Sequence, residues 1–199
     1  GRSDEVLSQV RQLVANSPVP VVVDADALGA FADPAVLADA PIARAPLVLT
    51  PHEGEFARLS GSRPGSDRIS AVVALAVRTG ATVLLKGSTT VVASPAGGVL
   101  VSTSGSPRLA TAGSGDVLAG VIAAFLAQGL VPLEAAALAA HAHGASAALG
   151  FSRGLAAGDL PELLAAWLSG LDSRERRALR GHTPRKSGPM SSQNRGGGW

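Results

Sequence analysis

The sequence has no cysteine and no tyrosine, and only four phenylalanines and two tryptophans among 199 residues. The lack of cysteine excludes disulfides, a thiol nucleophile and thiolate metal ligands. With so few aromatic residues, a core must be built from Ala, Val and Leu, and a hydrophobic fraction of 46% is enough for one full domain. No stretch is long and apolar enough to span a bilayer, and the first residues, GRSDEV, do not resemble a signal peptide. We therefore expect a cytoplasmic protein with no membrane partner.

Positive charge is concentrated at the C-terminal end of the chain. Residues 172–199 contain seven Lys/Arg and two Asp/Glu, a net of +5, whereas residues 1–171 contain ten and thirteen, a net of −3. The mildly acidic remainder argues against nucleic acid as a partner, despite a pI of 9.9. The basic end is rich in Gly, Ser and Pro and lacks apolar periodicity. We predict one domain over residues 1–170 and a basic, disordered tail over residues 171–199.

Along the chain, short apolar runs alternate with segments whose apolar residues have helical spacing. This order predicts an α/β fold with a mostly parallel central sheet flanked by helices. The strand candidates are continuous apolar runs, typical of strands buried on both faces, at 19–23, 47–49 and 82–86. Two more, at 90–94 and 99–102, surround PAGG and indicate a hairpin. Helical spacing occurs at 3–16, 34–40, 66–79, 133–149 and 159–168. Ligands of such sheets bind at the carboxyl ends of the strands, so the residues after each strand are the candidates for a site.

A glycine-rich turn at Ala112–Gly120, AGSGDVLAG, is the central feature of the sequence. Gly113 and Gly115 allow a tight turn and the close approach of another molecule. A helix follows and ends near Gly129, so unpaired amides and the positive end of the helix dipole form an anion site. Asp116 lies beside it. The alternative is an ordinary strand-to-helix connection in which Asp116 is an N-terminal cap.

Acidic residues and a histidine follow the first two predicted strands. Asp24 and Asp26 in DADAL are either site residues or ordinary turn and cap acids. In TPHEGE, Thr50 and Glu53 have the spacing of a capping box, with a proline in the first helical turn, which makes a structural role for Glu53 the expectation. His52 is then exposed at the strand end, either as a capping residue or as a site residue.

Lys86 ends the third predicted strand and begins the sequence KGSTT. It is one of only two lysines, beside fifteen arginines. An ammonium followed by glycine and hydroxyl residues suits a nucleotide phosphate, and the alternative is a solvated surface lysine. Two further histidines, His141 and His143, are two residues apart on a predicted helix and so face different sides. They cannot bind one metal together, and we interpret them as packing or surface residues.

Four motifs, DADAL, LTPHEGE, KGSTT and AGSGDVLAG, occur in an order and at spacings that resemble the ADP/ATP-dependent NAD(P)H-hydrate dehydratases. These are repair enzymes of the ribokinase-like superfamily, often fused to an epimerase domain. The motifs span Asp24 to Gly120, and the likeness continues through His143–Gly144 and fades near Leu168. Ser114 stands where the family usually has threonine. Relatives have a first lobe that ends in GPGLG, and Gly1 resembles its last glycine, so we expect the chain to begin within the ribokinase-like (Rossmann-like) domain.

The resemblance implies a reaction on NADH or NADPH that has been hydrated at C6 of the nicotinamide ring. ADP, or alternatively ATP, phosphorylates the hydroxyl, and loss of phosphate restores the ring double bond. Asp116 is implied as the catalytic base and, with His52 and Gly1, as a substrate contact. Mg²⁺ is expected to be held by the nucleotide phosphates, without a protein-built metal site. The implied nucleotide-binding residues are Lys86, Gly87, Ser88, Thr89, Thr90, Ala112, Gly113, Ser114 and Gly115.

Two other functions are compatible with the same motifs. A ribokinase-like kinase of a vitamin precursor would use the same anion site and base but release a phosphorylated product. A non-catalytic remnant would bind nucleotide without turnover. For the dehydratase, the resemblance implies fusion to, or cooperation with, an NAD(P)H-hydrate epimerase. We also expect a homo-oligomer.

Overall fold

The structure is a computed structural model that describes residues 3–32 and 43–181 by backbone, and side chains as far as residue 171. The chain divides into two units, Gly1–Trp167 and Leu168–Trp199. The helices are α1 (Asp4–Asn16), η1 (Ala25–Phe31), α3 (Glu53–Ser60), α4 (Arg68–Thr79), η2 (Pro107–Leu109), α5 (Ser114–Ala127), α6 (Pro132–Ala147), η3 (Ala157–Asp159) and α7 (Leu160–Gly181). The strands are β1 (Val21–Val23), β2 (Leu47–Leu49), β3 (Thr82–Leu85), β4 (Thr90–Ala93) and β5 (Val99–Ser102).

The five strands form one sheet in the order β1-β2-β3-β4-β5. β1, β2 and β3 pair in parallel, and β4 pairs antiparallel with both β3 and β5. In the part of the chain that the structure describes, four of the five strands therefore run in the same direction. The predictions of a mostly parallel α/β sheet and of a hairpin around PAGG are confirmed.

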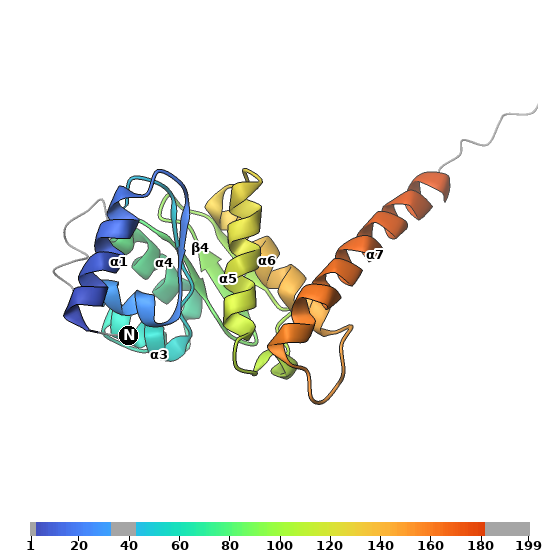
Figure 1. Ribbon diagram of the computed structural model, residues 1–199, viewed down its shortest axis with the longest axis horizontal. Coiled ribbons are helices and arrows are strands. Elements are labelled where there is room, and N and C mark those ends of the chain that lie inside the picture. The colour runs from blue at the N-terminus through green and yellow to red at the C-terminus, as the bar shows by residue number, and fades with distance from the viewer. Residues whose placement is uncertain (1–2, 33–42, 182–199) are drawn as a thin grey trace, which may run out of the picture. The chain divides into compact units, whose positions relative to one another are not determined.

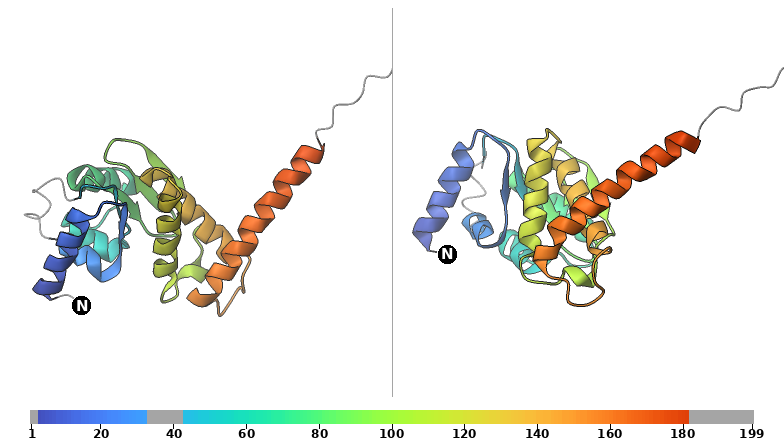
Figure 2. Two further views of the ribbon diagram at one scale, coloured as in Figure 1. Left: turned by 45° about the horizontal axis from the view of Figure 1, so that its top comes forward. Right: turned by 45° about the vertical axis from the view of Figure 1, so that its right-hand side comes forward.

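Alternating side chains of the strands supply two separate cores, one on each face of the sheet. Leu49, Val83 and Val91 belong to a cluster that includes residues of α1, η1, α3 and α4. Their neighbours Val48, Leu84 and Val92 point to the other face, where they pack with α5 and α6. Figures 1 and 2 show the same division, with α1, α3 and α4 on one side of the sheet and α5 and α6 on the other. Because both faces of β2, β3 and β4 are covered, these strands are mostly apolar, whereas Leu100 and Val101 of the edge strand β5 are exposed.

Most helix boundaries agree with the sequence pattern, and two do not. The helix that contains Leu168 was expected to end there, but α7 continues to Gly181. The capping box at the start of α3 does not use Thr50 and Glu53. His52 is the N-cap residue, and its partner in the box is Glu55. The predicted helix at 34–40 lies outside the described residues.

Helix α6 packs against the segment after β5 at a position where no side chain fits. A Cβ atom on Gly144 would lie 2.3 Å from the carbonyl oxygen of Ser104 and 2.6 Å from its carbonyl carbon. Both atoms are backbone, so the two segments would have to move apart to admit a side chain. Glycine is therefore required here by close approach, within a helix whose backbone any residue could adopt.

Gly144→Ala is expected to lower the free energy of unfolding by about 1–3 kcal/mol, the usual cost of overpacking. Gly120→Ala is the matched control, because Gly120 also lies in a helix but a Cβ there meets nothing within 4 Å. That change should raise stability by about 0.5–1 kcal/mol. Urea unfolding of the two variants measures both effects. Equal stability of the two variants would contradict the close contact.

None of the described helices is long and apolar enough to cross a membrane.

Candidate active site

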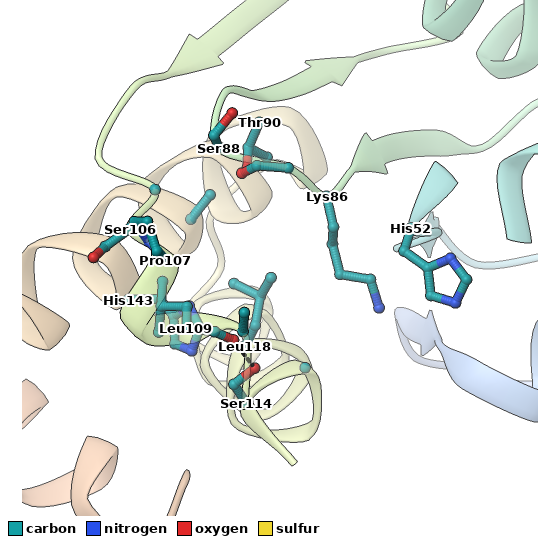
Figure 3. Close-up of a pocket in the computed structure, with 15 residues that line it drawn as sticks. His52, Lys86, Ser88, Thr90, Ser106, Pro107, Leu109, Ser114, Leu118 and His143 are labelled. Carbon is teal, nitrogen blue, oxygen red and sulfur yellow. Dashed lines mark hydrogen bonds between the residues drawn. The ribbon is translucent and has the colours of Figure 1, made fainter. Parts of the chain in front are cut away.

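A cavity of about 560 Å³ opens beside the carboxyl end of β3, between the loops that follow β3 and β5 and the start of α5. Figure 3 shows Lys86 and His52 on one side of it and His143, Leu109 and Ser114 on the other. This is the sheet edge at which the sequence predicts a site. Its wall is formed by His52, Lys86, Gly87, Ser88, Thr90, Gly105, Ser106, Pro107, Leu109, Ala110, Ser114, Gly115, Leu118, Ala140 and His143.

Lys86 is paired with two carboxylates, one directly after β1 and one in the first turn of α3. Its Nζ lies 2.7 Å from Oδ1 of Asp24 and 3.8 Å from Oε2 of Glu55. The side chains of Lys86 and Asp24 are only 22% and 12% exposed, so the pair is largely withdrawn from water. The backbone joins the ends of the neighbouring strands, since Thr50 N donates to Val23 O (3.1 Å) and Lys86 N to Pro51 O (2.9 Å). The interpretation of Lys86 as a solvated surface residue is wrong.

The backbone after Asp24 is strained. Ala25 has φ of 52°, and it is the only non-glycine residue with positive φ in the described part of the chain. This conformation costs an L-residue about 1–2 kcal/mol. Strain of this kind persists where the surrounding structure fixes it, and here it lies next to the carboxylate that holds Lys86.

The glycine turn begins α5 as predicted, with Gly113 as the N-cap residue at φ of 86°. The amide of Ser114 donates to Thr111 O (3.3 Å), and its hydroxyl donates to Leu109 O (2.7 Å). The amides of Ala112, Gly113 and Gly115 have no acceptor within the described ranges. Three donors are thus available to an anion at this helix end, rather than the four of Ala112–Gly115.

The start of α5 lies directly against Lys86. A Cβ atom on Gly115 would be 3.5 Å from Nζ of Lys86 and 3.4 Å from Oδ2 of Asp24. The end of α5 that carries the free amides therefore lies beside the Lys86–Asp24 ion pair, although 29 positions separate Gly115 from Lys86 in the sequence. A phosphate group is the ligand that such a combination suits.

Asp116 is in the first turn of α5 and is not its cap, so the capping alternative is wrong. The residue is exposed. Its carboxylate makes no hydrogen bond or ion pair with any residue that the structure describes. Asp116 follows Gly115, which lines the cavity, and its own side chain is not part of the cavity wall. The carboxylate is thus unengaged next to the anion site.

His52 has a structural role in addition to lining the cavity. Its Nδ1 accepts hydrogen bonds from the amides of Gly54 (2.9 Å) and Glu55 (3.2 Å). In return, Oε2 of Glu55 accepts from the amide of His52 (2.8 Å). This network assigns the proton of the neutral ring to Nε2, which lies 3.4 Å from Oε1 of Glu55. The Nδ1 atom of His52 thus caps α3, and the Nε2 atom of the same ring lies beside Glu55, which is also paired with Lys86.

His52→Ala is expected to lower the free energy of unfolding by about 1 kcal/mol, because two amides at the start of α3 lose their acceptor. His52→Asn is the matched control, since asparagine is a good N-cap and should keep stability within about 0.5 kcal/mol of the original protein. Urea unfolding of both variants tests this. Unchanged stability of His52→Ala would show that the cap contributes nothing.

The KGSTT loop is held by a second close backbone contact. A Cβ atom on Gly105 would lie 2.4 Å from Ser88 O and 2.9 Å from Gly87 O. The hydroxyl of Thr90 donates to Gly87 O (3.3 Å), which closes the loop on itself. Gly87, Ser88 and Thr90 line the cavity, whereas Thr89 is exposed and does not.

Two arginines fix the loops around the cavity. Arg68, at the start of α4, pairs with Glu53 and donates to Lys86 O (3.4 Å). Glu53 is thus structural, as expected, but through this ion pair instead of a capping box. Arg108 in η2 donates to three carbonyls at the C-terminal end of α6, those of Ala147, Ala148 and Gly150 (3.4, 3.1 and 3.1 Å). A cation is favourable at that end of a helix dipole.

The sequence-predicted site residues fall into three groups. Seven of them line the cavity: His52, Lys86, Gly87, Ser88, Thr90, Ser114 and Gly115. Four are next to it in the chain: Thr89, Ala112, Gly113 and Asp116. Gly1 lies outside the described residues.

Sequence reasoning missed Glu55 and His143 as parts of the site. Glu55 was missed because the spacing of Thr50 and Glu53 also fits a capping box, which drew the assignment to Glu53. His143 was assigned to packing or to the helix surface, but it lines the cavity and is 6% exposed. Burial lowers the pKa of His143, and a backbone hydrogen bond at Ser114 acts against this more weakly. The ring is therefore neutral near neutral pH.

No group of three or more His, Cys, Asp or Glu side chains that could hold a metal ion occurs within the described ranges.

A model of the NAD(P)H-hydrate dehydratase family matches residues 2–169. The bifunctional NAD(P)H-hydrate repair enzyme of Mycobacterium tuberculosis is 51% identical over 136 residues, which cover 68% of this chain and 28% of that protein. The ADP-dependent (S)-NAD(P)H-hydrate dehydratase of Neisseria meningitidis is 43% identical over 164 residues, which cover 78% of this chain and 55% of that protein. The chain thus spans well under two thirds of the length of either relative.

Solved structures show the same fold. The ADP/ATP-dependent NAD(P)H-hydrate dehydratase of Bacillus subtilis, co-crystallised with ATP/Mg²⁺, has a TM-score of 0.73 at 30% identity and covers 83% of this chain and 59% of its own. A ribokinase-like superfamily protein of Enterococcus faecalis has a TM-score of 0.67 at 26% identity, covering 84% of this chain and 60% of its own. The ribokinase-like fold expected from the sequence is confirmed.

Proposed function

The chain belongs to the NAD(P)H-hydrate dehydratase family, and from this premise we propose that it carries out the ADP-dependent dehydration of hydrated NADH or NADPH. In this proposal ADP phosphorylates the C6 hydroxyl of the hydrated ring and leaves as AMP. Elimination of inorganic phosphate, with loss of a proton from the neighbouring ring carbon, then restores the double bond. ADP is the preferred donor and ATP the alternative. The N. meningitidis relative is named as ADP-dependent, and the B. subtilis structure was obtained with ATP/Mg²⁺.

One observation supports the proposal above the others, namely the contact between Lys86 and the start of α5. The position of a Gly115 Cβ is 3.5 Å from the lysine Nζ, so the ammonium and the free amides can act on the same phosphate. Neither feature alone distinguishes a phosphoryl-transfer site from an ordinary helix end. Together they offer a transferring phosphoryl group amide donors and an ammonium that also holds the carboxylates of Asp24 and Glu55.

The roles proposed for individual residues follow from their positions. The amides of Ala112, Gly113 and Gly115 hold the transferring phosphoryl group. The carboxylate of Asp116 takes the proton from the C6 hydroxyl, which is the role of a general base. His52, and Gly1 outside the described residues, contact the hydrated nicotinamide. The remaining proposed nucleotide contacts are Lys86, Gly87, Ser88, Thr89, Thr90 and Ser114.

A magnesium ion fits this site only as part of the nucleotide complex. The described residues offer no cluster of metal ligands, while the helix end offers amides and an ammonium, which suit phosphate oxygens. Mg²⁺ bound to the nucleotide phosphates would neutralise charge on the phosphoryl group.

Three further features complete the proposal. We place the protein in the cytoplasm, where the nicotinamide cofactors that it repairs are used. The bifunctional relatives support fusion to, or cooperation with, an epimerase. A homo-oligomer is the proposed assembly.

The test is an assay of the full chain with hydrated NADH, ADP and Mg²⁺. If the chain is a dehydratase, NADH, followed by its absorbance, should appear together with AMP and inorganic phosphate in equal molar amounts. A stable phosphorylated product from a vitamin-precursor alcohol would instead identify a small-molecule kinase. Binding of ADP with no turnover of either substrate would identify a non-catalytic remnant.

A further inference from the structure

Arg68 joins three elements beside the cavity, although it does not line the cavity itself. It is the first residue of α4, and its guanidinium pairs with Glu53, the first residue of α3. The same group donates to the carbonyl oxygen of Lys86, directly after β3 (3.4 Å). A Cβ atom on Gly87 would lie 2.8 Å from Nη2 of Arg68. Lys86 and Gly87 both line the cavity, so Arg68 supports the cavity wall from outside.

Two features of Arg68 are unfavourable for stability. A cation at the first residue of a helix lies at the positive end of the helix dipole. In addition, Nε of Arg68 is buried and has no hydrogen-bond partner in the described part of the chain, which costs free energy. Arg78, in the last turn of α4, is at the favourable end of the same helix. The placement of Arg68 therefore favours a role in the site over a role in helix stability.

The bond from Arg68 fixes the orientation of the peptide group between Lys86 and Gly87. A peptide group is planar and trans, so its carbonyl and its amide point in opposite directions. Because the carbonyl of Lys86 is directed at Arg68, the amide of Gly87 points away from Arg68. Gly87 is exposed, and its amide has no acceptor within the described ranges. This amide is therefore a free donor on a residue of the cavity wall.

We propose that Arg68 is a positioning residue, which controls nucleotide affinity by holding the Lys86–Gly87 peptide so that the amide of Gly87 donates to a phosphate oxygen. This inference rests on the proposed function, since it assumes that a nucleotide occupies the cavity. A hydrogen bond from a cation to the carbonyl also polarises the peptide and strengthens its amide as a donor. Arg68 acts through this peptide and does not itself contact the ligand.

The experiment is calorimetric titration of the full chain and its variants with ADP in the presence of Mg²⁺. Arg68→Met removes the guanidinium and should weaken ADP binding about 3- to 10-fold, the effect of one hydrogen bond. Arg68→Lys keeps the positive charge but lacks the planar fork that reaches Glu53 and Lys86 O together, so its loss should be as large. Unchanged affinity in Arg68→Met would overturn the inference. Full affinity in Arg68→Lys would assign the effect to charge alone and would also overturn it.

Arg78→Met is the matched control. Arg78 is on the same helix, and its guanidinium donates to the carbonyl oxygens of Leu59 and Ser60 at the C-terminal end of α3. It does not line the cavity. Arg78→Met should lower the midpoint of urea unfolding at least as much as Arg68→Met, but should leave ADP affinity unchanged. A loss of ADP affinity equal to that of Arg68→Met would show a general effect of α4 and would overturn the assignment.

A second measurement avoids the risk that a variant fails to fold. In the unmutated protein with ¹⁵N-labelled glycine, the amide resonance of Gly87 should shift on addition of ADP. The resonance of Gly80, which follows α4 and does not line the cavity, should stay in place. A fixed Gly87 resonance with bound ADP would overturn the inference while leaving the proposed function intact. Failure of the unmutated chain to bind ADP at all would instead overturn the proposed function, and this inference with it.

Discussion

Asp116→Asn is expected to lower turnover of hydrated NADH at least about 10²-fold while the affinity for ADP changes little. Asparagine has nearly the same shape but cannot accept the proton of the hydroxyl. The side chain is exposed and makes no hydrogen bond or ion pair with other described residues, so its replacement should not disturb the fold. Steady-state kinetics, together with the dissociation constant for ADP, separate these effects. A near-normal rate would contradict the assignment of the base.

Glu134→Gln is the matched control for Asp116→Asn. Glu134 is an exposed acid in the first turn of α6, as Asp116 is in the first turn of α5, but it is not part of the cavity. Both changes remove a negative charge near a helix N-terminus, where such a charge adds about 0.3–1 kcal/mol to the free energy of unfolding. Similar small losses of stability, with a loss of turnover only for Asp116→Asn, are expected. Loss of turnover in both variants would indicate a general effect of helix charge.

Lys86→Met is expected to weaken ADP binding about 10- to 100-fold and to lower the free energy of unfolding by about 2–3 kcal/mol. Removal of one partner of a fully buried ion pair costs about 3–5 kcal/mol, and the 22% exposure of the Lys86 side chain places this pair somewhat below that range. The nucleotide loses a cation and meets the carboxylates of Asp24 and Glu55, which Lys86 otherwise neutralises. Calorimetric titration with ADP and urea unfolding give the two quantities. Unchanged ADP affinity in a folded Lys86→Met variant would restrict Lys86 to a structural role.

The double variant Lys86→Met/Asp24→Asn distinguishes charge imbalance from lost packing. Asp24→Asn removes the carboxylate that would be left without its cation, so the double variant should recover part of the stability lost in Lys86→Met. ADP affinity should stay low, because the ammonium is still absent. A loss of stability in the double variant equal to the sum of the losses in Lys86→Met and Asp24→Asn would contradict the ion pair as the source of the effect.

Strands β2, β3 and β4 were predictable because both of their faces are covered. Leu47–Leu49 is a continuous apolar run for this reason, and its bounds agree with those of β2. The start of α3 was not predictable in the same way, because TPHEGE offers two overlapping boxes, Thr50 with Glu53 and His52 with Glu55. Both match the spacing rule, and only the path of the chain after β2 decides between them.

The site was predictable in its position but not in its contacts. The motifs after the strands identified the sheet edge, since parallel strands all end there. The ion pair of Asp24 and Lys86 joins residues 62 positions apart, and its geometry depends on the register of β1, β2 and β3. The difference between His141 and His143 depends on which side of α6 faces the sheet. Local sequence carries little signal for it in a helix as rich in alanine as α6.

The most direct test of the anion site is a crystal structure of the full chain with ADP and Mg²⁺. We predict a phosphate oxygen within hydrogen-bonding distance of the amide of Gly115, about 2.7–3.2 Å, on the side that faces Nζ of Lys86. The carboxylate of Asp116 should border the space next to that phosphate, where a substrate hydroxyl would lie. Phosphates bound away from the start of α5, with the amides of Gly113 and Gly115 left to solvent, would contradict the account.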